Sequence, residues 1–249
     1  MVNLWKYFLL PVLSSFSELK LLHRKKNFTF IFVVFLSAQT LGQEVNMGAD
    51  LVSRYVLRGL EVANTPSMQP TLSVALWGFE TGVWGAYTLS NNTSASDEIN
   101  IWLGYNITSD AGNFSFSVID YYFPNSGKKI GNFKNDEGAH TLEGTFTYCG
   151  PISLLVACNF YNDPGNNIYF EFGYSFTADK IEFELYAGGT PGSKDNPGFY
   201  GAENFSMINI GVTASKKIKI TDDYEFPIFT SFIVNPRAEV AHIVFGITF

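Results

Sequence analysis

The chain has 249 residues, of which 16% are charged and 16% aromatic, with 24 Phe and 13 Tyr. So much apolar surface excludes an intrinsically disordered protein, and the lack of an uncharged apolar run of about 18 residues argues against a helical membrane protein. With 16 basic and 23 acidic residues the formal net charge is −7, so nucleic acid, a polyanion, is a poor partner. Aromatic residues and 22 glycines together favour β structure.

The N-terminal segment has the order of an export signal. A basic stretch at 23–27 is followed by an apolar run at 28–36 and by small and polar residues at 37–43. The apolar run is too short to span a bilayer. We therefore predict that residues 1–43 are an N-terminal extension with a cleavable signal peptide, and that residues 44–249 are the exported domain. Five basic residues and one acidic residue lie before residue 44, so this domain would carry 11 basic and 22 acidic residues.

From Val45 onward, apolar and polar residues alternate with period two, and no stretch shows a convincing helical period. The clearest case is 98–108, where Ile99, Ile101 and Leu103 begin an apolar face opposite Asn100 and Trp102. Such segments predict twelve strands, at 46–60, 70–78, 81–90, 98–108, 113–122, 139–149, 152–161, 168–177, 181–189, 204–217, 225–234 and 238–249.

The predicted connections differ in length in a regular way. Most of those after odd-numbered strands are long, at 61–69, 91–97, 123–138, 162–167 and 190–203, whereas most of those after even-numbered strands are tight turns. Long loops at one end and short turns at the other are typical of an outer-membrane barrel. A soluble sandwich, with Greek-key connections, has no reason for this inequality. The last connection, around Pro236, is short and breaks the rule.

The last predicted strand alternates outward to a terminal aromatic residue. Bacterial barrels end in such a strand, which their assembly machinery recognises, and we assign this role to Ala241, Ile243, Phe245, Ile247 and Phe249. Together these patterns predict an all-β fold: a 12-stranded antiparallel up-and-down transmembrane β-barrel in the outer membrane of a Gram-negative-type bacterium, preceded by a signal peptide.

The cost of burying charge decides which face meets lipid. A charge facing the middle of the bilayer costs about 2–4 kcal/mol, so the apolar face points outward and the polar face inward. The residues predicted to line the pore are Asp50, Arg54, Arg58, Glu98, Glu143, Glu171, Glu182 and Glu184. They could neutralise one another as a static plug or line a wet lumen. Asp120 falls on the apolar face, which a bulge near Ile119 or a position at the barrel rim would explain.

Few residues point to chemistry. Cys149 and Cys158 are too far apart along their predicted hairpin for a disulfide, so we expect both to be free and buried. Some twelve-stranded barrels are lipases with Ser two residues from the catalytic His, but Leu142 and Val244 occupy those positions after His140 and His242. No metal-ligand spacing, phosphate-binding loop or nucleophile elbow occurs, so we predict no enzyme, no catalytic residue, no metal and no cofactor.

Several of these residues resemble a known family. The segment 52–59, followed by Pro66 and Gln69-Pro70, is similar to the opening of the TorF-type porins. The resemblance continues at Gly78-Phe79-Glu80 and at Asn235-Pro236 and covers most of residues 44–249. It implies a twelve-stranded outer-membrane barrel with a porin role, in which Arg54 and Arg58 are signature residues.

Two functions remain open at this point. The first is a passive channel for small hydrophilic solutes or ions, narrow because twelve strands lie between a filled eight-stranded barrel and a wide porin, and cation-preferring because inward Glu is in excess. The second is a closed structural or surface-binding barrel without transport activity. Loops 123–138 and 190–203 are long enough to fold over or into the mouth. The expected partners are outer-membrane lipid, the barrel-assembly machinery and small solutes or ions. A soluble lipocalin-like barrel would instead bury its apolar face inside.

Overall fold

The computed structural model describes residues 44–90, 97–221 and 225–249, and the predicted signal segment lies outside them. The described residues form one compact unit. Its strands are β1 (Glu44–Val52), β2 (Tyr55–Leu57), β3 (Leu60–Ala63), β4 (Ser67–Leu76), β5 (Phe79–Thr88), β6 (Glu98–Ser109), β7 (Gly112–Tyr122), β8 (His140–Cys149), β9 (Ser153–Tyr161), β10 (Ile168–Ala178), β11 (Ile181–Thr190), β12 (Ser206–Lys219), β13 (Glu225–Asn235) and β14 (Val240–Thr248). A 3-10 turn at Pro124–Ser126 is the one helical element in the described part. None of the described helices has the length and apolarity needed to cross a membrane.

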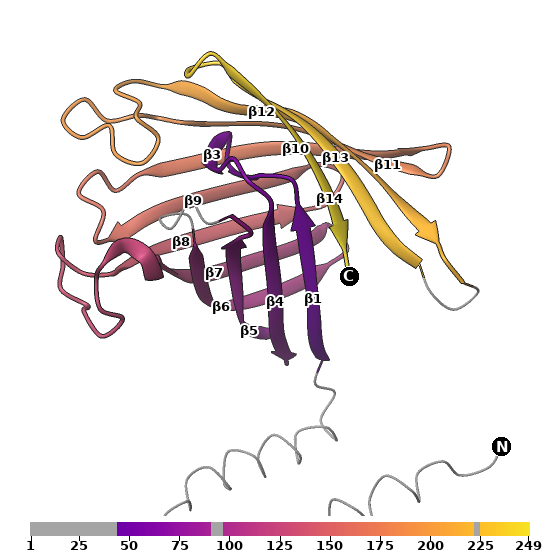
Figure 1. Ribbon diagram of the computed structural model, residues 1–249, viewed down its shortest axis with the longest axis horizontal. Coiled ribbons are helices and arrows are strands. Elements are labelled where there is room, and N and C mark those ends of the chain that lie inside the picture. Colours follow the sequence, from indigo (N-terminus) through magenta and orange to yellow (C-terminus); the bar gives the residue numbers. More distant parts are fainter. Residues whose placement is uncertain (1–43, 91–96, 222–224) are drawn as a thin grey trace, which may run out of the picture. The chain divides into compact units, whose positions relative to one another are not determined.

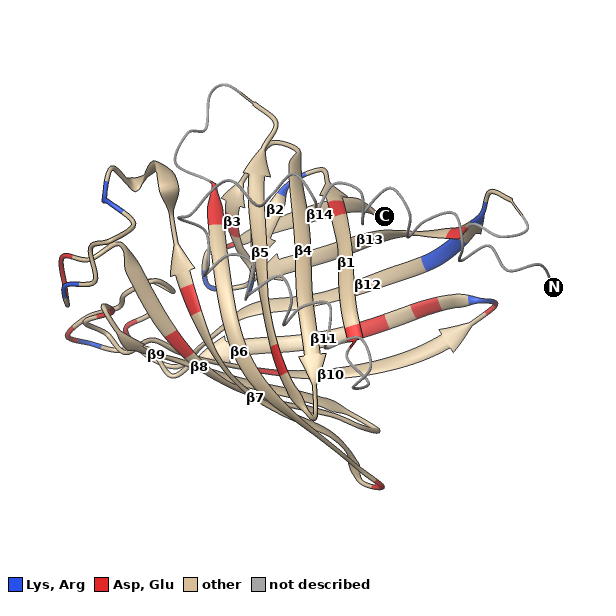
Figure 2. Cartoon of the chain, turned by 90° about the horizontal axis from the view of Figure 1, so that it is seen from below, with Lys and Arg blue, Asp and Glu red and all other residues tan. Residues whose placement is uncertain are grey.

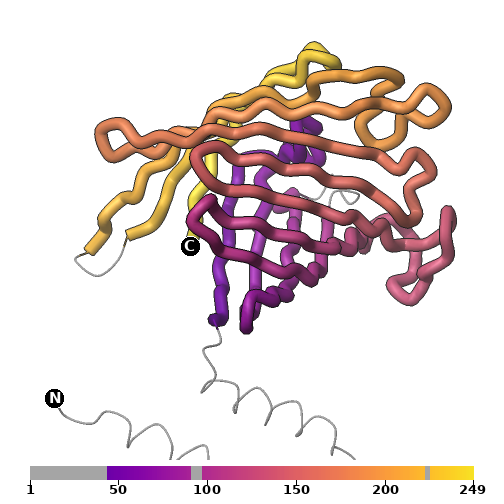
Figure 3. The backbone as a smooth tube through the Cα atoms, turned by 180° about the vertical axis from the view of Figure 1, so that it is seen from behind, coloured from indigo at the N-terminus to yellow at the C-terminus, as the bar shows by residue number. Residues whose placement is uncertain are grey.

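Twelve of these strands close into a barrel. Each of β4 to β14 pairs antiparallel with its neighbour in the chain, and β1 closes the ring by pairing with both β4 and β14. Figures 1 and 3 show the wall from opposite sides, with consecutive strands lying next to one another. The seam between the first and last strands is short and pairs residues 50–52 with 246–248. The predicted twelve-stranded up-and-down barrel is therefore confirmed.

The two ends of the barrel differ as predicted. We call the end with short links the turn end and the other the loop end. The links at the turn end are 77–78, 110–111, 150–152, 179–180 and 220–224. The links at the loop end are 53–66, 89–97, 123–139, 162–167, 191–205 and 236–239. The connection at Pro236 remains short although it lies at the loop end.

The two faces of the wall also follow the predicted alternation. Leu103, Phe172 and Phe245 are 59%, 54% and 61% exposed on the outside of the barrel. Glu98 and Glu143 are 1% and 2% exposed inside it. An apolar belt around a polar interior is the reverse of a soluble barrel, in which the apolar face lies inside.

The first predicted strand, 46–60, is wrong beyond Val52. The chain leaves the wall at Ser53, forms β2 and β3 as a separate two-stranded sheet, and rejoins the wall at Ser67. Arg58 and Gly59 make the turn between β2 and β3, with φ of 51° and 78°. Two consecutive left-handed residues match the right-handed twist of a tight hairpin and reverse the chain. We call residues 53–66 the lumen hairpin.

The lumen hairpin lies inside the barrel. Its residues contact β8 on one side of the barrel and β12 and β14 on the opposite side. In the ring of twelve strands, β8 and β14 lie six places apart. Gly59 lies so close to β12 that a Cβ atom there would come within 1.8 Å of the Ile208 carbonyl oxygen. The hairpin therefore lies in the lumen, with Gly59 against β12 and Arg58 reaching β8 on the opposite side.

Asp120 needs no bulge. The register of β7 with β6 and with β8 is continuous through this residue. Asp120 lies near the loop end, where both its carboxylate oxygens are 2.9 Å from Nδ1 of His140. Nε2 of His140 is 2.6 Å from the Ile130 carbonyl oxygen, and Phe133 stacks on the imidazole at 4.0 Å. Of the two explanations, the rim position is confirmed, and the contact attaches loop 123–139 to the wall.

The cysteines are free, as predicted. Cys149 is exposed and Cys158 is partly buried, so the expectation that both are buried is wrong. Cys149 is the last residue of β8 and pairs with Asn113 and Ser153 at the turn end, where the short links leave its thiol uncovered.

Candidate functional site

The candidate site is centred on Arg58 at the tip of the lumen hairpin. Its Nη1 and Nη2 atoms donate to the two carboxylate oxygens of Glu143 on β8, at 2.6 and 2.8 Å. Nη1 also donates to the Tyr200 hydroxyl at 2.8 Å, and the guanidinium lies 4.8 Å from the centre of the Tyr169 ring. A bidentate pair with a cation–π contact uses the planar geometry of arginine in a way that lysine cannot.

Further polar contacts hold the hairpin in the lumen. The Tyr55 hydroxyl donates to Glu98 at 3.1 Å, and Asn235 Nδ2 donates to the Gly59 carbonyl at 3.1 Å. Arg54 donates to Glu61 at 2.6 Å within the hairpin, and His242 Nδ1 on β14 lies 3.7 Å from the same carboxylate. These contacts come from β6, β13 and β14, so the hairpin is attached around much of the barrel.

Tyr200 connects an outer loop to this centre. It lies in loop 191–205, is 4% exposed and stacks on Tyr169 at 5.8 Å between ring centres. Burial raises the pKa of Tyr200 to about 12, although the nearby Arg58 lowers it. The hydroxyl is therefore neutral at ordinary pH and accepts the Arg58 hydrogen bond. Of the two arrangements for which loop 190–203 was long enough, folding over the mouth or into it, the buried Tyr200 shows the second.

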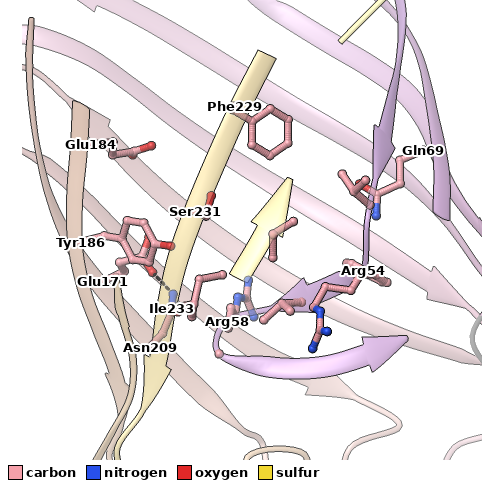
Figure 4. A pocket seen from close by; sticks show the side chains of 15 residues that line it. Arg54, Arg58, Gln69, Glu171, Glu184, Tyr186, Asn209, Phe229, Ser231 and Ile233 are labelled. Carbon is pink, nitrogen blue, oxygen red and sulfur yellow. Dashed lines mark hydrogen bonds between the residues drawn. The ribbon is translucent and has the colours of Figure 1, made fainter. Parts of the chain in front are cut away.

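Three cavities follow one another along the lumen. The lumen cavity, of 290 Å³, lies between the hairpin and the wall. Figure 4 shows Arg54 and Arg58 on its hairpin side and Glu171 and Glu184 on the opposite wall. The outer pocket, of 240 Å³, lies toward the loop end, and the inner cavity, of 260 Å³, lies toward the turn end. Arg58 lines both the lumen cavity and the outer pocket, so it forms the partition between them.

The predicted pore-lining residues separate into groups. Arg58 and Glu143 form the ion pair, with Glu98 beside it through Tyr55. Arg54 and Arg58 lie on the lumen hairpin, so their predicted placement on the first strand is wrong. Strand β1 ends at Val52 because the chain bends at Ser53 and Arg54, and the Arg58-Gly59 turn then reverses it inside the lumen.

The acidic residues on β10 and β11 lie farther down the lumen. Glu171 and Glu184 line the lumen cavity, and Glu182 lines the inner cavity. Asp50 lies at the seam, where it accepts a hydrogen bond from Thr248 Oγ1 at 2.5 Å. Among the described residues, no ion pair includes Glu171, Glu182 or Glu184. Figure 2 shows acidic residues along β11 and a basic stretch on β12 near the turn end.

Several residues of the site were not predicted from the sequence. Tyr169 and Tyr200 contact the hairpin but carry no motif, and Asn235, which belongs to the Asn235-Pro236 resemblance, was given no role. Asn209 was also missed: its Nδ2 donates to Glu171 at 2.7 Å, while its Oδ1 is buried without a partner. Gly59 between two short apolar runs was a weak signal, because glycine supplies the positive φ of a two-residue hairpin turn, although Arg58 stands where Asn or Asp is usual.

The described residues contain no group of three or more His, Cys, Asp or Glu side chains placed to hold a metal ion. The site is therefore a set of charged and aromatic side chains around an obstructed passage.

A model of a bacterial protein family of unknown function, Gcw_chp, matches residues 37–225, about three quarters of the chain. The chain belongs to this family. No curated protein matches the chain. The family and the twelve-stranded barrel together fit an outer-membrane barrel protein of bacteria. The resemblance to TorF-type porins is not confirmed by this match and stays a prediction.

Proposed function

We propose that this protein is an outer-membrane channel of the TorF-type porin kind, which passes small hydrophilic solutes or ions through a narrow, cation-preferring lumen. The wall strands have 9 to 14 residues, enough for a tilted strand to span the bilayer core, which needs about 9–11. The apolar side chains on the outside of the wall suit contact with lipid.

The observation that carries the proposal is the position of Arg58 between two cavities. A shift of the hairpin tip would join the outer pocket to the lumen cavity, which continues to the inner cavity through their shared residue Glu184. The carboxylates of Glu171, Glu182 and Glu184 face this route without ion-pair partners among the described residues, which favours cations over anions.

One observation favours the alternative, a closed barrel without transport. Arg58 has a bidentate carboxylate partner, a hydroxyl partner and an aromatic partner, and Asn235 holds the neighbouring Gly59. A hairpin attached so firmly would keep the cavities separate, and the exposed loops would then be the functional surface.

Planar-bilayer conductance under a salt gradient distinguishes the two functions. We expect the folded chain to give small, cation-selective steps, and Arg58→Ala to give larger ones because the partition is removed. Lys134→Ala, which removes an exposed positive charge of loop 123–139 away from the hairpin, serves as the charge-matched control and should conduct like the parent. Heat-modifiable migration shows whether each protein is folded. If neither the folded parent nor folded Arg58→Ala gives conductance steps, the closed barrel is supported. Anion selectivity would contradict the proposed preference.

A further inference from the structure

The outer pocket has the walls of a small-molecule site. The hairpin contributes Leu57 and Val62, loop 191–205 contributes Phe199 and Tyr200, and the wall contributes residues of β6 to β9. At 240 Å³ the pocket is slightly smaller than typical small-molecule sites, which begin at about 300 Å³. A ligand of about one ring with a short substituent fits this space, whereas a peptide or an oligosaccharide would project from it.

The charge in this pocket is negative. Three carboxylates line it, from Glu98, Glu143 and Asp163, against the single guanidinium of Arg58. Glu143 is neutralised by Arg58, and Asp163 accepts hydrogen bonds from Asn159, Gly165 and Asn167. These two carboxylates are therefore already satisfied by groups of the protein.

Glu98 differs from the other two carboxylates because it is not paired with Arg58, as Glu143 is, and accepts hydrogen bonds from fewer donors than Asp163 does. It is 1% exposed and accepts hydrogen bonds from the Tyr55 hydroxyl at 3.1 Å and from Asn100 Nδ2 at 2.8 Å. In the described part of the chain, no cationic group pairs with it. The Oδ1 atom of the adjacent Asn100 is also buried without a hydrogen-bond partner. A buried carboxylate with no counter-charge is costly, so a donor that carries positive charge would be favoured beside it.

Aromatic rings add to this preference. Tyr121, Phe123, Phe199 and Tyr200 line the same pocket. The faces of such rings attract an ammonium or guanidinium group, by about 0.5–2 kcal/mol depending on desolvation. The Arg58 guanidinium already makes a cation–π contact with the Tyr169 ring, so aromatic rings of this site accommodate a cation. Leu57, Val62 and Pro164 supply apolar surface for the uncharged part of a ligand.

We propose that the outer pocket binds a small organic cation with an apolar body, the ammonium group lying beside Glu98 and the body lying between the hairpin and Phe199. Neutral and anionic molecules of the same shape bind more weakly, because they carry no positive charge to pair with the Glu98 carboxylate. This binding goes beyond the proposed channel function and does not require an open lumen, so the two proposals fail independently.

Isothermal titration of the full chain in detergent micelles tests this with three probes of one shape: benzylamine, benzyl alcohol and benzoate. The heats of the same probes with empty micelles are subtracted. We expect benzylamine to bind at least tenfold more tightly than benzyl alcohol, and benzoate to give no binding. In Glu98→Gln, which keeps the side-chain shape, the advantage of the amine should fall at least tenfold. Glu203→Gln removes an exposed carboxylate of loop 191–205 outside the pocket and should leave binding unchanged.

Equal affinity for benzylamine and benzyl alcohol would overturn the proposal, as would the absence of benzylamine binding at millimolar concentration. An unchanged amine preference in folded Glu98→Gln would overturn the assignment of Glu98. If Glu98→Gln does not fold, Phe199→Ala replaces it, because Phe199 is 47% exposed and its removal takes away one ring contact with Tyr200 but no hydrogen bond of the site. This variant should bind both benzylamine and benzyl alcohol more weakly, and unchanged binding would place the ligand outside the outer pocket.

Discussion

The barrel wall and the lumen hairpin are held by different forces. Wall strands of 9 to 14 residues pair on both sides through backbone hydrogen bonds, and their side chains need only the right polarity on each face. The hairpin strands have three and four residues and pair only with each other. The hairpin stays in place through a few side chains, above all Arg58. A wall of this kind tolerates many sequences, whereas the hairpin depends on single residues.

The largest expected effect comes from the ion pair that holds the hairpin. In Glu143→Gln the Arg58 guanidinium stays buried but loses its counter-charge, and breaking a buried pair in this way costs about 3–5 kcal/mol. Urea unfolding in lipid vesicles, followed by tryptophan fluorescence, measures the loss. Glu225→Gln, at an exposed position at the turn end, should change stability by less than about 0.5 kcal/mol. If Glu143→Gln lowers the free energy of unfolding by less than about 1 kcal/mol, water solvates the Arg58 guanidinium in the variant and the ion pair does not hold the hairpin.

The wall is tested by placing the same charge on each of its faces. Leu103→Arg puts a guanidinium at the middle of the apolar outer face of β6, which costs about 2–4 kcal/mol in a bilayer. Thr177→Arg puts it on the inner face, where Thr177 is exposed and lines the inner cavity, and should cost much less. Both are measured by unfolding in vesicles. Equal losses would mean that the outer face does not contact lipid.

The same contrast explains what the sequence could predict. Period-two alternation and link length were sufficient for the twelve wall strands, because both are local properties of the chain. At Ser53 the alternation continues through Tyr55 and Leu57, so the pattern alone did not reveal that the chain leaves the wall. Gly59 is the local signal for this reversal, and it is a weak one because Arg58 stands where Asn or Asp is usual in such a turn.

The contacts of the hairpin were beyond prediction for a different reason. Arg58 meets Glu143 and Tyr200 at sequence separations of 85 and 142 residues. Which inward side chains meet across a lumen depends on the stagger and tilt of all the strands, and no short pattern carries that information. The acidic residues were therefore correctly expected to be inside, while the pairing of one of them with Arg58 and the isolation of Glu98 required the structure.

Gly59 tests whether the hairpin must contact β12. Its φ of 78° would strain an alanine by about 1–3 kcal/mol, and the added Cβ would meet the Ile208 carbonyl oxygen. Gly127 has nearly the same φ, 77°, with no atom within 4 Å of the position that a Cβ would occupy, so Gly127→Ala carries the strain without the clash. We expect limited proteolysis to cleave residues 53–66 faster in Gly59→Ala than in Gly127→Ala. Equal cleavage would show that the hairpin does not depend on its contact with β12.

The smallest expected effect lies in loop 162–167, which uses side-chain contacts as the hairpin does. Burial alone would raise the pKa of Asp163, but hydrogen bonds from the Asn159 and Asn167 amides and from two backbone N–H groups outweigh it and lower this pKa. The contribution to stability is thus complete above the unfolded pKa of about 3.9 and is lost as the pH falls through the lower folded value. Because the group is partly exposed, we expect less than about 1 kcal/mol. An NMR titration of the Gly165 and Asn167 amides should show a midpoint below about 3.9 that disappears in Asp163→Asn. A midpoint at or above that value would mean that these hydrogen bonds do not stabilise the carboxylate, and that the loop relies on its backbone turn instead.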